Sequence, residues 1–336
     1  MASPSTSIFP FFAAADRPAW QSALAEAVRD PAELCRLTGL DPSLAEEARL
    51  AAGGFPLLVP RPYLARIRRG DPADPLLAQV LPRALEQAET PGFTADPLGE
   101  TEAQCIPGVL GKYPGRLLIV ATGACGVHCR FCFRRHFAYP QISWESAIDR
   151  LAGEQSVEEV ILSGGDPLIL PDEQLTQIAN RLAAIPHVRR LRLHTRLPIV
   201  IPDRVTDGLL ACLRATRLTP LMVVHVNHPA ELDDAVAAAL GRLIDAGVPV
   251  LSQSVLLRGV NDDVGVLTAL FRRLVDLRVM PYYLHQLDAV AGAAHFEVPV
   301  AVGKQLIAQL RALLPGYAVP RYVRETRGAA GKSALA

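Results

Sequence analysis

Three cysteines lie close together in one short segment of the chain. Cys125, Cys129 and Cys132 stand in "ACGVHCRFCFRRHF", with three residues between the first two and two between the last two. A single tight loop can direct three thiolates at this spacing toward one point. Because cysteine thiolates bind zinc and iron–sulfur clusters, the segment predicts a metal or redox centre.

The number of ligands separates these two kinds of centre. A structural zinc ion takes four protein ligands, and they usually come as pairs from two separate segments. No second cysteine or histidine pair at zinc spacing is evident, although His128, His136 and Cys105 remain candidates for a fourth ligand. The second interpretation is a [4Fe–4S] cluster with three irons tied to cysteine and one iron open to another ligand. Both interpretations stay open on the cysteines alone.

From Arg116 onward, short apolar runs typical of strands alternate with amphipathic helical patterns. In residues 172–185, for example, Leu175, Ile178, Leu182 and Ile185 form one apolar stripe. Strand and helix alternate six times, which predicts parallel strands joined by right-handed crossovers. The predicted strands are residues 116–122, 159–164, 189–195, 221–226, 248–255 and 280–288.

Polar or unusual residues stand at the carboxyl end of nearly every predicted strand. The cysteines follow the first strand, and the segments "SGGDP", "HTR" and "HVNH" end the next three. Gln253 and Ser254 lie within the fifth strand, and Asp288 ends the sixth. An open doubly wound sheet could also hold six units, but a barrel collects these ends around one mouth. The sequence therefore predicts an α/β fold, a partial (β/α)6 TIM-like barrel with a helical N-terminal extension and a short C-terminal tail.

The chain divides into four predicted segments. Residues 1–90 carry helical patterns broken by proline, and residues 91–115 form a linker rich in proline and glycine that enters the barrel. Residues 116–315 form the barrel, and residues 316–336 hold a strand-like run and a tail of small residues. Taken alone, Lys332 in this tail would be a solvated charge on a disordered end.

Composition narrows the class of ligand. The chain has 34 Lys and Arg against 34 Asp and Glu, so it has no global attraction for nucleic acid or for an anionic membrane. No apolar run approaches the roughly 20 residues of a membrane span, and the apolar start lacks the basic leader of a signal peptide. Six cysteines in 336 residues do not resemble a disulfide framework. These features predict a cytoplasmic protein with a small-molecule site.

The cysteine spacing, with Phe131 before the third cysteine, resembles the radical S-adenosylmethionine superfamily. In that superfamily the open iron binds the amino and carboxylate groups of S-adenosylmethionine, and a glycine-rich segment after the second strand binds the methionine amino group. Taken alone, "SGGDP" is only a turn before a helix. The resemblance implies a [4Fe–4S] cluster on the three cysteines. It also implies S-adenosylmethionine contacts from Phe131, Ser163, Gly164, Gly165, Asp166, His228, Gln253 and Ser254.

Several ordered motifs narrow the resemblance further. "CRFCFRRHFAYP", "ILSGGDPL", "LRLHTRLPIVIP", "SQSVLLRGVND" and "MPYYLHQLD" together resemble the lysine 2,3-aminomutases over about residues 90–336. The likeness is greatest to the branch that serves elongation factor P, the EpmB type. Members of the family also carry pyridoxal 5′-phosphate on a lysine that follows a run of small residues. Here "RGAAGKSALA" makes Lys332 the implied catalytic and cofactor-binding lysine.

The resemblance also implies the contacts of the second cofactor and of the substrate. Lys112, Tyr113 and Arg116 match the residues that hold the phosphate, although "GKYPGR" alone reads as a basic turn before a strand. Arg134 matches the residue that binds the substrate carboxylate, and its planar fork suits that anion. Asp288 and Glu325 match the anions at the far end of a lysine side chain. Glu325 stands where the family has aspartate, which leaves the placement of the substrate open.

The activity implied by the resemblance is that of an isomerase. It converts (S)-α-lysine to (R)-β-lysine through a 5′-deoxyadenosyl radical and a pyridoxal phosphate aldimine. Its partners would be free L-lysine, an external electron donor and, functionally, elongation factor P with its lysine ligase. Three alternatives remain: an aminomutase for another amino acid such as glutamate, a radical enzyme without pyridoxal phosphate, and a zinc-stabilised binding protein.

Overall fold

A ten-stranded sheet forms the centre of the protein. The computed structural model describes residues 17–336. Residues 1–16, which include part of the predicted helical region and of the apolar start, lie outside the described residues. The strands follow one another across the sheet in chain order. They are β1 (Gln104–Ile106), β2 (Val109–Tyr113), β3 (Arg116–Thr122), β4 (Glu159–Gly164), β5 (Arg190–Thr195), β6 (Thr219–His225), β7 (Val250–Val255), β8 (Met280–His285), β9 (Arg321–Arg324) and β10 (Ser333–Ala334).

The six predicted strands correspond to β3 through β8, and all of their pairings are parallel. The strand order is linear, so the curved sheet is a partial barrel rather than a closed one. The predicted fold class is therefore confirmed. The structure adds β9, which pairs parallel to β8 as a seventh strand. Strands β1 and β2 extend one edge, and β10 extends the other, in antiparallel pairings.

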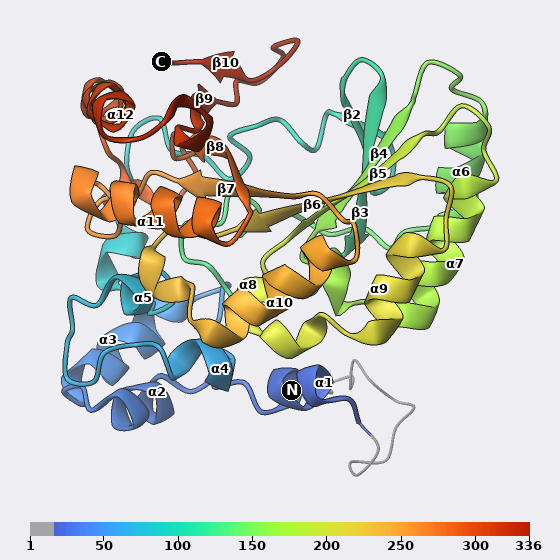
Figure 1. The fold of residues 1–336 in the computed structure, drawn as a ribbon. Helices are drawn as coiled ribbons and strands as arrows, with labels where there is room; N and C mark the ends of the chain where they lie inside the picture. The colour runs from blue at the N-terminus through green and yellow to red at the C-terminus, as the bar shows by residue number, and fades with distance from the viewer. Residues whose placement is uncertain (1–16) are drawn as a thin grey trace.

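Helices wrap the outer side of this sheet (Figure 1). The apolar stripe predicted in residues 172–185 is buried, with Leu175, Ile178, Leu182 and Ile185 each at most 5% exposed. The longer helices of the barrel are α6 (Trp144–Ala152), α7 (Asp172–Ala183), α9 (Asp207–Arg214), α10 (Asp234–Asp245), α11 (Val264–Asp276) and α12 (Val300–Leu313). Shorter turns are η3 (Pro167–Ile169), α8 (Leu197–Val200), η4 (Pro202–Arg204), η5 (Pro229–Glu231), η6 (Ala294–Phe296) and η7 (Gly316–Ala318).

Side-chain caps set where several of these helices begin. Thr206 accepts a hydrogen bond from the backbone N–H of Leu209 at the start of α9. Asp233 and Asp263 do the same at the starts of α10 and α11. Each cap satisfies a backbone donor that the first turn of a helix leaves without a partner. These short polar residues therefore fix the phase in which each apolar stripe meets the sheet.

The N-terminal region packs against the barrel and shares its core (Figure 1). Leu34, Val59, Tyr63 and Leu76 are at most 2% exposed and belong to the same apolar cluster as the barrel strands. Because one core joins the two parts, this region can position loops of the barrel. Its elements are α1 (Ala19–Ala25), α2 (Pro31–Thr38), α3 (Ser43–Ala52), α4 (Arg61–Leu64), α5 (Pro75–Ala78) and η2 (Ala84–Gln87).

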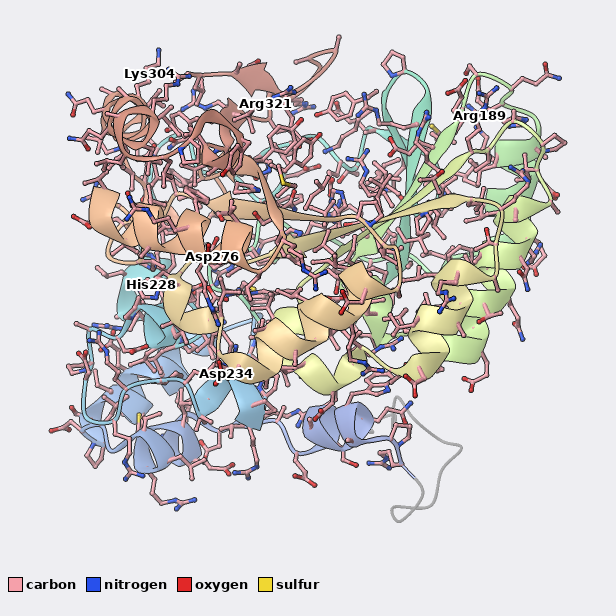
Figure 2. The ribbon with its side chains drawn as sticks, viewed as in Figure 1. Arg189, His228, Asp234, Asp276, Lys304 and Arg321 are labelled. Carbon is pink, nitrogen blue, oxygen red and sulfur yellow. The ribbon has the colours of Figure 1, made fainter. Side chains whose placement is uncertain are left out.

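Charged side chains of both signs lie around the outside of the molecule (Figure 2). Asp234, Asp276 and Lys304 are exposed on the outer helices, and Arg189 and Arg321 are exposed beside β5 and on β9. Within residues 17–336, none of the helices has the length and apolar character that crossing a membrane requires. Concentrated charge inside the molecule is found instead around one cavity.

Candidate active site

A cavity of about 540 Å³ runs along the inner side of the sheet. At one end of the cavity is the cysteine loop, which follows the carboxyl end of β3. At the other end is the turn between β2 and β3, flanked by Tyr113 and Arg116. The structure thus brings together residues from position 112 to position 332 of the chain. The predicted residues that line it are Lys112, Tyr113, Arg116, Cys125, Cys129, Phe131, Cys132, Arg134, Ser163, Gly164, Gly165, Asp166, Gln253, Ser254, Asp288, Glu325 and Lys332.

The cysteine loop is held by backbone groups of the N-terminal region. The N–H of His128 donates to the carbonyl of Leu58 at 3.1 Å, and the N–H of Arg130 donates to the carbonyl of Gln79 at 2.9 Å. The imidazole Nδ1 of His128 lies 2.8 Å from the carbonyl oxygen of Pro56. His128 therefore anchors the loop, which accounts for a histidine placed between two cysteines.

A buried carboxylate strengthens this attachment. Glu86 in η2 accepts from Nε of Arg130 at 2.9 Å and from Nη2 at 2.6 Å. It also accepts from Arg135 at 2.7 Å, and Arg130 donates to the carbonyl of Phe55 as well. The Arg130 side chain is fully buried and Glu86 is 1% exposed in its side chain. Glu86 is thus the shared counter-ion of two arginines that flank the last cysteine of the loop.

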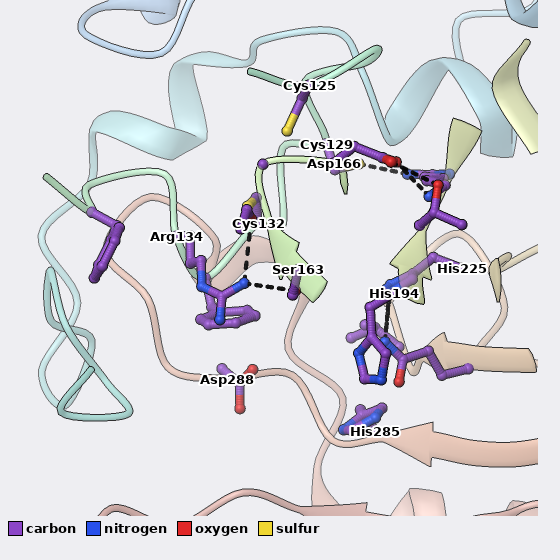
Figure 3. A pocket seen from close by; sticks show the side chains of 18 of the residues that line it. Cys125, Cys129, Cys132, Arg134, Ser163, Asp166, His194, His225, His285 and Asp288 are labelled. Atoms are coloured by element: carbon purple, nitrogen blue, oxygen red, sulfur yellow. Dashed lines mark hydrogen bonds between the residues drawn. The ribbon is translucent and has the colours of Figure 1, made fainter. Parts of the chain in front are cut away.

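The three thiols lie in one cavity but do not converge in this structure (Figure 3). Burial raises the pKa of the Cys132 thiol to about 11, and the neighbouring Cys129 adds to the effect. Burial also raises the pKa of Cys125, and Cys132 is the next cause. The sulfur of Cys129 accepts a hydrogen bond from Arg196 at 2.7 Å. Among the described residues, no three Cys, His, Asp or Glu side chains form a ready metal-binding group.

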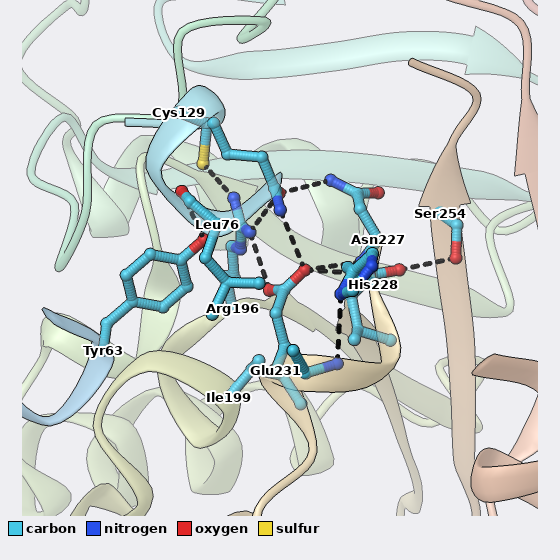
Figure 4. A network of polar contacts seen from close by, with 12 residues as sticks. Tyr63, Leu76, Cys129, Arg196, Ile199, Asn227, His228, Glu231 and Ser254 are labelled. Atoms are coloured by element: carbon cyan, nitrogen blue, oxygen red, sulfur yellow. Dashed lines mark hydrogen bonds and ion pairs between the residues drawn. The ribbon is translucent and has the colours of Figure 1, made fainter. Parts of the chain in front are cut away.

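Arg196 joins the cysteine loop to a buried polar network (Figure 4). Its Nη2 donates to Gln79 at 2.6 Å and to Glu231 at 2.8 Å, while Nη1 meets Cys129. Glu231 is fully buried and also accepts from the backbone N–H of Asn227. Sequence reasoning did not select Arg196, because its partners lie on segments far from it in the chain.

The glycine segment after β4 packs directly on the cysteine loop. A Cβ on Gly165 would lie 2.1 Å from the carbonyl oxygen of Ala124, and Gly164 has a φ of +117°. Only glycine fits both conditions. Asp166 accepts from Thr195 at 2.7 Å and from the N–H of Arg196 at 2.7 Å. Burial raises the pKa of Asp166 to about 6 against these hydrogen bonds. Asp166 thus positions Arg196 as well as lining the cavity.

Three histidines face the cavity from three strands of the sheet (Figure 3). They are His194 on β5, His225 on β6 and His285 on β8. Burial lowers the pKa of His225 to about 3 and that of His194 and His285 well below the usual value, so all three are neutral. Nε2 of His194 and Nε2 of His285 are buried without a hydrogen-bond partner. Buried nitrogens of this kind need a partner, which a ligand or an ordered water in the cavity can supply.

His228, which the sequence predicted as a cofactor contact, does not line the cavity. It begins η5, where its imidazole accepts from the N–H of Ala230 at 3.1 Å. In "HVNH" the histidine that lines the cavity is His225, which is hydrogen-bonded to Gln253. The alternation of side chains along β6 could have indicated this, because His225 shares a face with the other inward residues.

A chain of alternating charges forms one wall of the cavity. Arg134 donates from Nε and Nη2 to Glu100, at 2.6 and 2.8 Å. Lys112 lies 3.0 Å from Glu100 and 2.9 Å from Glu325, and Glu325 also pairs with Lys332. Four residues of this chain, Arg134, Lys112, Glu325 and Lys332, were predicted from the sequence. The fifth, Glu100, was not.

Asp288, Tyr113 and Arg116 complete this wall. Burial raises the pKa of Asp288 to about 7, the charge of Glu325 adds to the effect, and Lys332 opposes it. The guanidinium of Arg116 lies 5.4 Å from the centre of the Tyr113 ring. The wall thus offers carboxylates for a cationic ligand and basic groups for an anionic one.

Comparison with known proteins places this site in a family. A model described as "Radical SAM superfamily" matches residues 119–269. The chain is 44% identical over 322 residues to a protein named L-lysine 2,3-aminomutase from Haemophilus influenzae, covering 94% of this chain and 95% of the relative. A protein of the same name from Escherichia coli is 45% identical, covering 94% of each. The chain belongs to the L-lysine 2,3-aminomutase family. The predicted radical S-adenosylmethionine fold and family are thereby confirmed.

The residues present fit the cluster and the S-adenosylmethionine that the radical S-adenosylmethionine family implies. Three thiols on one loop match a three-cysteine cluster in kind and number, and a ligating sulfur can still accept a hydrogen bond like that of Arg196. Nε2 of His194 and Nε2 of His285, which are buried without a hydrogen-bond partner, can each form a hydrogen bond with a polar ligand. Lys332, with Lys112 and Arg116 in the same wall, fits an aldehyde cofactor that carries phosphate.

Proposed function

We propose that this protein is an L-lysine 2,3-aminomutase that converts free (S)-α-lysine to (R)-β-lysine. One observation carries the proposal: the cysteine loop, Arg134, Asp288, Glu325 and Lys332 line a single cavity in a member of the aminomutase family. Two carboxylates at one end favour a substrate with a cationic side chain over glutamate.

Each group of the cavity has a task in this reaction. When bound, the [4Fe–4S] cluster with S-adenosylmethionine supplies a 5′-deoxyadenosyl radical, and pyridoxal 5′-phosphate supplies the conjugated system for amino transfer. Lys332 attaches the latter cofactor, and Lys112, Tyr113 and Arg116 hold its phosphate. Asp288 and Glu325 bind the ε-ammonium group of lysine. The enclosed cavity keeps water away and holds the reacting atoms in register.

The biological setting belongs to the same proposal. The enzyme acts in the cytoplasm, takes electrons from an external donor, and supplies (R)-β-lysine to the ligase that modifies elongation factor P. It acts on free lysine because Arg134 recognises a free carboxylate, which an amide-linked lysine has lost.

The deciding experiment is an anaerobic assay of the holoprotein with reductant, S-adenosylmethionine and labelled L-lysine, followed by amino acid analysis. The expected product is β-lysine, with no reaction on glutamate or on elongation factor P that already carries α-lysine. Lys332→Ala should abolish borohydride labelling by the bound cofactor and leave the iron content unchanged. Labelling of a different lysine, or rearrangement of only the protein-bound lysine, would refute the assignment.

A further inference from the structure

The guanidinium of Arg134 already holds a carboxylate of the protein itself. Glu100 accepts from Nε at 2.6 Å and from Nη2 at 2.8 Å, in the planar two-bond geometry that an arginine uses for a carboxylate ligand. Both side chains are buried, with Arg134 6% and Glu100 2% exposed. Glu100 comes from the loop before β1, which the sequence predicted as a linker.

The remaining N–H groups of Arg134 cannot bind a second carboxylate through two parallel hydrogen bonds. A guanidinium has five N–H groups. Glu100 takes one on Nε and one on Nη2, while Nη1 donates to Ser163 Oγ at 3.1 Å and to the carbonyl of Gly164 at 3.2 Å. A single N–H on Nη2 is left. A substrate carboxylate that binds Arg134 through two parallel hydrogen bonds must therefore take the edge that Glu100 occupies.

Glu100 has a second cation to which it can turn. Lys112 Nζ lies 3.0 Å from Glu100 Oε1. Asp96 accepts from the backbone N–H of Glu100 at 2.9 Å and from that of Thr101 at 3.0 Å, so the backbone is fixed. Rotation of the Glu100 side chain alone can release Arg134. When the substrate carboxylate takes Arg134, Glu100 keeps Lys112 as its counter-ion, so neither Arg134 nor Glu100 is left without a charged partner.

We propose that Glu100 is an internal occupant of the substrate-carboxylate position, and that the α-carboxylate of the substrate displaces it from Arg134. This inference rests on the proposed function and identifies a specificity-determining residue in it. An amine without a carboxylate cannot displace Glu100, since nothing would then neutralise Arg134. A carboxylate in the right place can, because it restores both hydrogen bonds.

Loss of the Glu100 charge should therefore strengthen the binding of lysine. In the free protein Arg134 would be buried with a weaker, neutral partner, which raises the free energy of that state. The substrate carboxylate would restore the missing charge. Apparent affinity rises when a competing arrangement of the free protein is removed.

The test compares L-lysine with cadaverine, the same diamine without the carboxylate. The unreduced holoprotein, which cannot turn over, is titrated with each ligand, and dissociation constants come from the absorbance of bound pyridoxal phosphate. Glu100→Gln should bind lysine about tenfold more tightly and cadaverine unchanged. The matched control is Glu102→Gln, which removes the same charge from the same loop. Glu102 is exposed and pairs only with exposed Arg327 among the described residues, so both constants should stay at the wild-type value.

A second variant covers the case in which Glu100→Gln fails to fold. Glu100→Asp keeps the buried charge but shortens its reach, so it should tighten lysine binding by a smaller factor. Weaker or unchanged lysine binding in the variants would overturn the inference, because Glu100 would then hold Arg134 in place for the substrate. An equal change for lysine and cadaverine would overturn it too. Wild-type protein that binds neither ligand would instead contradict the proposed function.

Discussion

Two carboxylates, Glu100 and Glu325, form ion pairs with three cations that face the cavity. Arg134 pairs with Glu100, Lys332 pairs with Glu325, and Lys112 pairs with both. Each of these charged side chains therefore has an ion-pair partner before any ligand binds. Each ligand group that enters exchanges with an existing partner, so the cost of burying an isolated charge never arises.

Asp288 gives the site a testable dependence on pH. Its pKa is raised to about 7, chiefly by burial and next by Glu325, with Lys332, Lys112 and Glu100 as the other charged neighbours. The folded protein then binds more protons than the unfolded chain between about pH 4 and pH 7. The contribution of Asp288 to stability therefore falls with rising pH in that window and levels off above it.

Asp288→Asn should remove this part of the pH dependence. The free energy of unfolding, measured in urea at pH 5 and pH 8, should fall less between the two values in the variant than in the wild type. Ionised Asp288 should also improve the binding of the lysine ammonium group as the pH rises through about 7. The same decline in stability in both proteins would contradict the raised pKa.

At the scale of residues, nearly all of the predicted site residues line the cavity, but several of their partners were not predicted. Arg134, Asp288, Glu325 and Lys332 could be selected because the resemblance to the aminomutase family implies a role for each position. Glu100 and Arg196 could not be, because each acts through a contact with a distant segment. His225 lines the cavity and His228 does not, and the alternation of residues along β6 is a local signal that points to His225.

At the scale of elements, the N-terminal region and the barrel meet at the cysteine loop. Carbonyls of Leu58 and Gln79 hold the loop backbone, and Glu86 in η2 holds two of its arginines. Apolar periodicity predicted helices in the N-terminal region, but nothing in that sequence indicated that the region contributes to the site. That role depends on Glu86 meeting Arg130, 44 positions away, which local sequence does not encode.

Glu86→Gln should weaken the cysteine loop. It leaves Arg130 and Arg135 buried without their counter-ion, a change that typically costs about 3–5 kcal/mol. Iron retained after anaerobic reconstitution and gel filtration should fall, and urea unfolding should shift to lower concentration. Glu89→Gln serves as the control, because Glu89 is exposed in the segment after η2. Full iron retention in Glu86→Gln would show that the loop holds its shape without this carboxylate.

At the scale of the whole molecule, the alternation of strands and helices predicted the barrel correctly. Periodicity and the polar residues at the strand ends located β3 through β8. The seventh parallel strand, β9, was expected only as a strand-like run, because its place beside β8 depends on the packing of α12. The place of Lys112 and Arg116 in the cavity was expected only from the family resemblance, since periodicity alone points to the carboxyl ends of the barrel strands.

Binding of S-adenosylmethionine should stabilise the whole fold. A ligand that binds only the folded state at 100 times its dissociation constant adds about 2.7 kcal/mol to the free energy of unfolding. Anaerobic urea unfolding of the reconstituted protein should show this gain, and protein with Cys125, Cys129 and Cys132 changed to Ala should not. Cys105→Ala should keep it, because Cys105 is exposed and does not line the cavity. A gain in the triple variant would place the ligand away from the loop.

The charged wall also has an order of assembly. Arg134 and Glu100 are 34 positions apart in the chain, whereas Lys112 and Glu325 are 213 positions apart. Closing the longer loop costs more chain entropy, and during synthesis Glu325 emerges long after the other three. A growing chain can therefore pair Arg134 with Glu100 while the side of the cavity that β9 completes is still open. Until β9 pairs with β8, the cysteine loop and the Arg134–Glu100 pair can already be in place, but Lys332 does not yet line the cavity.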